Sequence, residues 1–369
     1  MVDPLSRGAA EERAEAEALL LLQRLPGVAD RGIASLVARF GTGRAALGAP
    51  AAEFGAALGR PELSAQRGHP LDRAAVAQAL ARADEIGARV VPIGSPAYPT
   101  RLLRLTDPPP VLFLRGDCSL LQGTAVALVG ARKATPYGRR VAARLAETLA
   151  RSGVVVLSGL ALGVDGEAHK GALAAGGATM AVLGCGPDVV HPATHERLFR
   201  AVIERGLLLT ELTPGAPALP HHFPRRNRVL AALAQVVVVV EAAERSGALI
   251  TAGHALDLSV EVMAVPGPID AATSAGSNAL LRDGAPPVWG AQDVLDALGL
   301  PGAPVIPAAP ADGDAAAVWA ALDGAPSALD DVAARSGLSA RRTLAALSLL
   351  ELDGWAVQAG GARYARRGG

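Results

Sequence analysis

Near its middle the chain reads Val126-Ala127-Leu128-Val129, an apolar run of strand length that ends at Gly130. Runs of the same kind follow at residues 154–157, 180–183, 207–209, 236–240 and 262–265. Helical patterns separate them. After the first run, Val141, Leu145 and Leu149 recur every four residues among charged side chains, which predicts one apolar stripe on a polar helix. Apolar strands that alternate with helices indicate a parallel sheet covered on both faces. The sequence therefore predicts an α/β fold with a Rossmann-like, doubly wound, mostly parallel sheet over residues 123–298.

Two segments precede the predicted sheet. Residues 1–60 have the pattern of a small helical module of the SAM or helix-hairpin-helix kind, because Leu25-Pro26-Gly27-Val28 has the composition of a turn between two helices. Such modules bind the DNA backbone through hairpin amides, bind proteins, or only pack, and the sequence leaves all three open. Residues 61–122 are rich in proline, and we interpret them as a connecting segment that leads into the sheet.

Two further segments follow the sheet. Residues 299–313 form a Pro/Ala linker whose composition suits an extended spacer. Residues 314–323, 327–336 and 340–352 have helical patterns, and residues 355–364 have that of a hairpin, so we expect a winged-helix-like domain over 314–369. Arg341 and Arg342 would begin its third helix. Two arginines are weak evidence for DNA reading, and a protein-binding or structural role fits equally well.

The composition limits the class of protein. With 369 residues and 50% hydrophobic content, the chain can form two or three domains with sizeable cores. It has 35 basic and 35 acidic residues, so any nucleic-acid site must be a local patch. The chain has two cysteines, Cys118 and Cys185, and they lack the spacing of metal ligands. So few cysteines are typical of a protein from a reducing cytoplasm. No apolar run reaches the ~20 residues of a membrane span. We expect a cytoplasmic protein that does not bind membranes.

One local patch stands out. The run Phe223-Pro224-Arg225-Arg226-Asn227-Arg228 places three guanidinium groups beside an aromatic ring in a chain that is only 3% aromatic. Neighbouring cations repel one another and favour phosphates, and the ring can stack on an unpaired base. A solvated surface loop is the alternative interpretation.

The predicted strand ends carry small and basic residues. Ligands of open parallel sheets bind beyond the carboxyl ends of the strands. Ser246 and Gly247 precede a predicted helix whose first amides would be free to bind an anion. Each glycine at the strand ends is also explained by a tight turn. However, Arg132, Lys133 and Lys170 are expected near the same rim as the basic run. The basic run and this rim together predict nucleic-acid binding.

Other chemistries find less support. The sequence contains neither a P-loop nor the Gly-x-Gly-x-x-Gly fingerprint, so we expect no nucleotide cofactor. Asp165 and His169 are four residues apart, as are His191 and His195, which is a spacing of metal ligands. Neither pair has the Glu that would complete a His-Glu-x-x-His metal site, and Asp165 is more simply explained as a helix N-cap. We therefore expect no metal. Glu211 and Glu241 at strand ends could form a catalytic pair, but we favour ion pairing that holds the basic run. We therefore predict no catalytic residue.

The sequence of the predicted sheet domain resembles that of the DNA-processing protein A family, called DprA or Smf. The resemblance spans about 125–290 and rests on five motifs in order: 129–132 with 137–138, 158–165 with 168–169, 223–228, 241 with 246–252, and 264–267 leading to 276–278 and 284–285. The chain departs from the common family pattern at His191 and His195, at Thr210-Glu211-Leu212 and at Val260.

The resemblance implies a recombination mediator that binds single-stranded DNA, forms a homodimer through the Rossmann-like domain and loads RecA during natural transformation. It also makes single-strand DNA-binding protein a possible further partner. Gly130, Arg132, Phe223, Arg225, Asn227 and Arg228 match the family's DNA-contacting positions. With the rim residues, the predicted DNA-binding set is Gly130, Arg132, Lys133, Lys170, Phe223, Arg225, Arg226, Asn227, Arg228, Ser246 and Gly247. The alternative is a nucleotide phosphoribohydrolase-like enzyme, because Glu241 and residues 246–251 occupy the comparable strand-to-helix turn, although they lack the glycine pair of that class.

Overall fold

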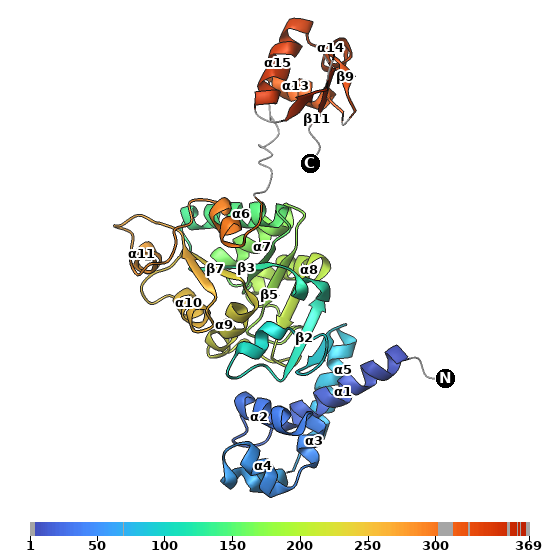
Figure 1. Cartoon of the computed structure of the whole chain (residues 1–369), viewed down its shortest axis with the longest axis vertical. Coiled ribbons are helices and arrows are strands. Elements are labelled where there is room, and N and C mark those ends of the chain that lie inside the picture. Colours follow the sequence, from blue (N-terminus) through green and yellow to red (C-terminus); the bar gives the residue numbers. More distant parts are fainter. Residues whose placement is uncertain are drawn as a thin grey trace. The chain divides into compact units, whose positions relative to one another are not determined.

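The computed structural model of the chain describes residues 4–68, 70–301, 313–323, 325–352, 355–359, 361 and 363–366. Two compact units make up the fold, Met1–Pro301 and Gly302–Gly369 (Figure 1). Within the described ranges, no helix is both long and apolar enough to cross a membrane.

An eight-stranded sheet in the order β1-β2-β6-β5-β4-β3-β7-β8 forms the centre of the first unit, and its first two strands are β1 (Arg89–Pro92) and β2 (Val111–Gly116). The six apolar runs form its parallel strands: β3 (Ala125–Gly130), β4 (Val155–Ser158), β5 (Thr179–Val182), β6 (Leu207–Thr210), β7 (Val236–Glu241) and β8 (Glu261–Ala264). The chain winds from β3 outward to β6 and then returns to place β7 on the other side of β3. The predicted mostly parallel sheet is confirmed, and its strand order reverses between β3 and β7.

Helices cover both faces of this sheet. Successive side chains of β3 point to opposite faces. Val126 and Leu128 pack with α6 (Pro136–Arg151), α7 (Val164–Ala174) and α12 (Ala291–Ala297), whereas Ala127 and Val129 pack with α9 (His222–Leu233) and α10 (Gly247–Asp257). Figure 1 shows α6 and α7 on one side of β3 and β7, with α9 and α10 on the other. The doubly wound prediction is thus confirmed. The remaining elements here are η3 (Cys118–Gln122), η4 (Ala193–His195), α8 (Glu196–Arg205), η5 (Ala272–Ser274) and α11 (Ala275–Arg282).

The sheet is wider than the predicted range 123–298. β1 (Arg89–Pro92) and β2 (Val111–Gly116) lie in the segment that we interpreted as a connection, yet they pair with each other and β2 pairs with β6, all antiparallel. Antiparallel strands need no crossover helix, so the alternation that reveals a parallel sheet is missing here. The prolines between these two strands hid them further.

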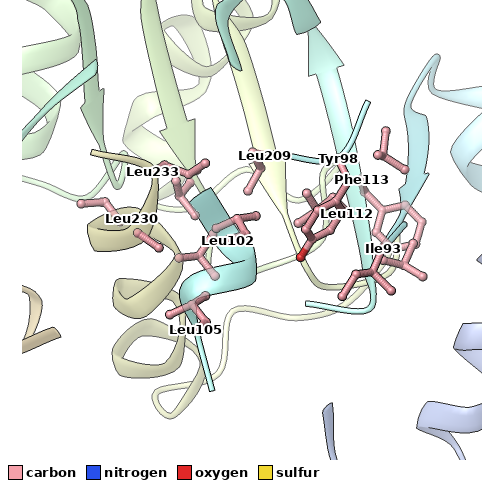
Figure 2. Packing of buried hydrophobic residues seen from close by; sticks show 14 of the residues in the cluster. Ile93, Tyr98, Leu102, Leu105, Leu112, Phe113, Leu209, Leu230 and Leu233 are labelled. Carbon is pink, nitrogen blue, oxygen red and sulfur yellow. The ribbon is translucent and has the colours of Figure 1, made fainter. Parts of the chain in front are cut away.

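The segment between β1 and β2 also supports α9. The short helix η2 (Thr100–Arg104) buries Leu102 completely. Figure 2 shows Leu102 and Leu105 close to Leu230 and Leu233 of α9, and these residues belong to one hydrophobic cluster. The segment 61–122 therefore fixes the helix that carries the basic run.

The N-terminal helices agree with the predicted helical module. They are α1 (Pro4–Gln23), α2 (Asp30–Phe40), α3 (Gly43–Gly48) and α4 (Ala51–Ala57), followed by η1 (Pro61–Gly68) and α5 (Arg73–Glu85). Gly27 has a φ of 78°, in the left-handed region that favours glycine, and it lies in the turn between α1 and α2. This is the turn expected from residues 25–28.

The second unit has the winged-helix pattern. Helices α13 (Gly313–Ala321), α14 (Leu329–Ser336) and α15 (Ala340–Leu352) accompany a small sheet of β10 (Ala356–Gln358), β11 (Arg363–Arg366) and β9 (Ser327–Ala328), in that order. Trp319 and Trp355 meet edge to face, with ring centroids 4.7 Å apart. The linker predicted at 299–313 lies largely outside the described residues, which resume at Gly313.

Candidate functional site

A cleft of ≈ 710 Å³ opens at the carboxyl ends of β3 and β7, where the strand order reverses. Open α/β sheets bind their ligands at this kind of switch point, and the volume is that of a ligand pocket. Three segments supply most of its walls: residues 129–132 at the end of β3, the start of α9, and residues 243–251 around the start of α10. The predicted rim is thus a hollow in the structure.

Gly130 allows the end of β3 to pack closely against β7. The amide of Ala131 donates to the Glu241 carbonyl at 2.7 Å. A methyl group at Gly130 would lie 2.6 Å from a Val164 side-chain carbon and 2.9 Å from the Glu241 carbonyl oxygen. Only glycine fits without displacing these neighbours, and the chain continues from it to Arg132 in the cleft wall.

An aromatic ring with a cation over it lies in the cleft. The guanidinium carbon of Arg132 is 4.9 Å from the centre of the Phe223 ring, within the range of a cation–π contact. The His191 ring is 5.3 Å from the same ring and tilted by 41°. Arg132 and Phe223, which are 91 positions apart in the sequence, are thus brought together as predicted.

The basic run is helical and is not a surface loop. Residues 223–228 belong to the first turns of α9, where proline is tolerated because amides of a first turn have no partner within the helix. Helical geometry then separates the side chains by face. Phe223, Asn227 and Leu230 line the cleft, whereas Arg225 and Arg228 do not.

Arg225 and Arg228 instead bind carboxylates. Arg228 Nη2 lies 2.6 Å from Glu211 Oε2, and Arg228 Nε lies 3.1 Å from Asp107. Arg225 Nη2 lies 2.5 Å from Asp30 at the start of α2 and 3.3 Å from Glu211. Burial raises the pKa of Glu211, and the two arginines act to lower it. Glu211 therefore holds the basic run by ion pairing, as favoured from the sequence, and these arginines are less available to a phosphate than we expected.

Arg226 forms an inner wall of the cleft. It is only 5% exposed, and its Nη1 donates to the Val182 carbonyl. Burial lowers the pKa of Arg226, while the nearby Asp165 carboxylate acts to raise it. The Arg226 Nε has no hydrogen-bond partner among the described residues. A buried cation with an unused donor in a cleft wall favours a ligand that carries acceptor oxygens.

The start of α10 forms another wall of the cleft. Ser246 is the N-cap and accepts a hydrogen bond from the Ala248 amide at 3.3 Å, and Asn227 Nδ2 donates to the Gly247 carbonyl at 3.2 Å. A helix N-terminus carries partial positive charge and attracts anions. Arg245 also lines the cleft, is exposed, and has no ion-pair partner within the described part of the chain. Arg245 is not in the predicted set, although it directly precedes the predicted pair Ser246 and Gly247.

Comparison with protein families agrees with this arrangement. The model of the family "DNA recombination-mediator protein A" matches residues 89–299, and that of the DprA winged helix domain matches residues 302–362. The chain belongs to the DprA/Smf family.

Relatives of this DprA/Smf chain include curated and solved proteins. Protein Smf of Escherichia coli (strain K12) is 38% identical over 315 residues, which cover 82% of this chain and 84% of that protein. The X-ray structure of DprA from Streptococcus pneumoniae has a TM-score of 0.68 at 31% identity, over 76% of this chain and 97% of that one. A DprA structure from Helicobacter pylori, described as showing a unique single-stranded DNA binding mode, has a TM-score of 0.53 at 29% identity, over 58% and 97% of the two chains.

Two lysines of the predicted set lie outside the cleft. Lys170 is on α7 and pairs with Glu167 at 2.9 Å, one turn earlier on the same helix. Lys133 is exposed beside Arg132 but is absent from the cleft wall. The cleft of this DprA/Smf chain therefore contains seven of the predicted residues: Gly130, Arg132, Phe223, Arg226, Asn227, Ser246 and Gly247.

The residues with metal-ligand spacing have structural partners. The Thr179 hydroxyl donates to the Val156 carbonyl, so His169 Nδ1 must donate to that hydroxyl, and its Nε2 accepts from the Leu160 amide. Burial lowers the pKa of His169 to about 3, so the ring is neutral. The described residues contain no cluster of three metal-ligating side chains.

Asp165 and Glu241 differ from their predicted roles. The N-cap of α7 is Gly163, and Asp165 instead accepts from the amides of Gly159 (3.1 Å) and Ala161 (3.4 Å). Glu241 does not hold the basic run. Its carboxylate accepts from the amide and the hydroxyl of Thr135, the latter at 2.8 Å, and so fixes the start of α6. Both carboxylates order the backbone around the cleft.

Proposed function

We propose that the cleft binds single-stranded DNA. The observation that carries this proposal is the contact of Arg132 with Phe223 at the switch point of the sheet. The ring can stack on any base and the cation beside it can bind any phosphate, so the site binds without reading sequence. A duplex keeps its bases stacked on one another and offers Phe223 no free face. The described DNA binding mode of the Helicobacter pylori relative supports this proposal.

We further infer that the protein acts as a recombination mediator that protects incoming DNA and loads RecA onto it during natural transformation. Membership of the DNA recombination-mediator family supports this inference. We also propose that it acts as a homodimer through the Rossmann-like domain, with single-strand DNA-binding protein as a further partner. Two clefts on one strand raise the effective concentration of the second binding event.

The rival enzyme function has less support. A glycosidic-bond hydrolase needs a carboxylate directed at its substrate. Glu241, the carboxylate nearest the comparable turn, binds Thr135. Incubation with nucleoside monophosphates tests the alternative, and we expect no release of free base. Steady release that a Glu241→Gln variant lacks would favour the enzyme.

Equilibrium binding tests the proposed function. We expect fluorescence anisotropy to show tighter binding to a labelled oligonucleotide than to its duplex, with little dependence on sequence. Phe223→Ala should weaken binding by about 1–3 kcal/mol and leave the salt dependence nearly unchanged, because the ring binds a base and no phosphate. Phe40→Ala is a matched control, since Arg39 lies over that ring at 5.7 Å, outside the cleft. Equal losses in both variants would remove the site from the cleft.

RecA filament growth tests the inferred role. On single-stranded DNA already coated with single-strand binding protein, the full chain should shorten the lag before RecA filaments grow. Phe223→Ala should lose this effect in proportion to its loss of DNA affinity. A protein that binds DNA but leaves the lag unchanged would have a protective role only.

A further inference from the structure

The segment that leaves the cleft after Arg132 carries a concentration of positive charge. Between residues 132 and 144 there are five cations and no acidic residue: Arg132, Lys133, Arg139, Arg140 and Arg144. The whole chain is neutral, with 35 basic and 35 acidic residues. This local excess of positive charge begins at Arg132 in the cleft wall and continues through the first half of α6.

Helical geometry gathers part of this charge on one face. Tyr137, Arg140 and Arg144 are spaced i, i+3 and i+7 on α6, so they lie along the same side of the helix. All three are exposed, and Tyr137 retains 39% of its surface. Lys133 is exposed just before the helix begins. We call these four residues, Lys133, Tyr137, Arg140 and Arg144, the α6 track.

The cations of the α6 track are unpaired, unlike cations on neighbouring helices. Lys170 on α7 pairs with Glu167, and Arg200 on α8 pairs with Glu196. On α6 itself the first ion pair joins Arg151 to Glu147, beyond the track. In the part of the chain that the structure describes, Lys133, Arg140 and Arg144 have no carboxylate partner. Three exposed cations without counter-charges favour an anionic ligand.

Hydrogen bonds fix the start of α6 to the ends of two strands of the sheet. Thr135 caps α6 and donates to Glu241, the last residue of β7, and the segment that follows β7 lines the cleft. The Tyr137 hydroxyl donates to the Pro266 carbonyl at 2.9 Å, which fixes the ring beside the cations. Lys133 directly follows Arg132 of the cleft wall, and Tyr137 lies in the first turn of α6.

From this continuity we propose that the α6 track binds the continuation of the single strand whose other nucleotides lie in the cleft. The inference rests on the proposed function and extends the DNA site beyond the switch point. Lys133, Arg140 and Arg144 bind successive phosphates, and Tyr137 offers a ring face to a base. The repeating charge of the strand, rather than its sequence, is the feature recognised.

Oligonucleotides of two lengths separate the track from the cleft. A thymidine oligomer of about 4 nucleotides can occupy the cleft alone, and one of about 16 can reach the track as well. Arg140→Gln with Arg144→Gln should lower the affinity for the long oligomer roughly tenfold and reduce its log–log salt slope by about 1.4, which is two phosphate contacts. Binding of the short oligomer should stay unchanged. Arg39→Gln with Arg197→Gln changes the net charge equally at exposed sites on α2 and α8 and is the matched control.

Each result decides the question. Equal losses for both lengths, or an equal loss in the control, would show that the cations act only through the overall field and would overturn the track. An unchanged affinity of the variant for the long oligomer would also overturn the proposal. An acidic protein surface would then be the remaining candidate ligand of these cations. If the wild-type protein bound neither oligomer, the proposed function itself would fail, and the track with it. Retained binding of the short oligomer keeps the two failures distinguishable.

Discussion

At the scale of single residues, three arginines within four positions have different environments. Arg226 is buried in the cleft wall, Arg228 is buried among carboxylates, and Arg225 is half-exposed beside Asp30. The sequence shows their charge but not these neighbours, because Asp30 and Glu211 come from distant segments. Phe223 and Arg132 could be predicted as a pair, since both follow from the strand-end rule and the chemistry of single-strand binding.

Arg228 is expected to act mainly in stability. Its side chain is 6% exposed and that of Glu211 is 5% exposed. Arg228→Ala leaves a buried carboxylate without its closest counter-charge, so the free energy of unfolding should fall by about 3–5 kcal/mol. Arg200→Ala breaks an exposed pair with Glu196 and should change it by about 0.5 kcal/mol or less. Urea denaturation measures both, and equal effects would contradict the assignment.

The loss in Arg228→Ala should depend on pH. Burial already raises the pKa of Glu211 above its ordinary 4.5, and removing an arginine that lowers it raises the pKa further. A carboxyl whose pKa is raised by folding contributes stability below its unfolded pKa and loses that contribution as the pH rises through the folded pKa. The stability difference between the variant and the wild type should therefore be smaller at about pH 5 than at about pH 8. A difference that grows on acidification would show that Glu211 is not the group left unpaired.

At the scale of elements, the strands were predictable wherever helices separate them. The runs from β3 to β8 each precede or follow a helix with apolar periodicity, and all six appear in the sheet. β1 and β2 were missed because only the short helix η2 lies between them, without the apolar periodicity of an α-helix, and because the connection is rich in proline. The sequence does not show that the basic run starts a helix, because Pro224 and three arginines conceal the apolar face that begins at Phe223 and continues to Leu230.

Gly159 tests how closely the elements around the cleft fit. It follows β4, and a Cβ there would collide with the buried Arg226 guanidinium. Gly159→Ala should lower the free energy of unfolding by about 1–3 kcal/mol and weaken DNA binding, because Arg226 must move. Gly253→Ala in α10 meets no atom within 4 Å and is the control, with an expected gain of about 0.5–1 kcal/mol from helix propensity. Wild-type stability and binding in Gly159→Ala would show that Arg226 is not held against this turn.

At the scale of the whole molecule, the two units could both bind DNA, and charge reversal separates them. Arg132 lies in a concave cleft of the first unit, where a reversed charge repels a phosphate at close range. Arg341 is exposed on α15 of the second unit. Arg132→Glu should abolish binding of single-stranded DNA, whereas Arg341→Glu should weaken it only slightly. Equal losses in an anisotropy titration would mean that the second unit shares the site.

The proposed dimer also belongs to this scale. Light scattering should report twice the monomer mass of 37.2 kDa for the full chain. The affinity for long strands should then exceed that for short strands as the second cleft engages. A monomer that still binds long strands tightly would exclude the dimer as the source of affinity.

Photocrosslinking tests the central claim most directly, because it reports which residue contacts a base. Single-stranded DNA containing 5-iodouracil is bound to the full chain, irradiated and digested, and the modified peptide is identified by mass spectrometry. We predict that the main adduct lies on the peptide containing Phe223, and that excess unlabelled single-stranded DNA removes it while duplex does not. An adduct confined to the winged helix or to the N-terminal helices, with the Phe223 peptide unmodified, would contradict the assignment of the cleft.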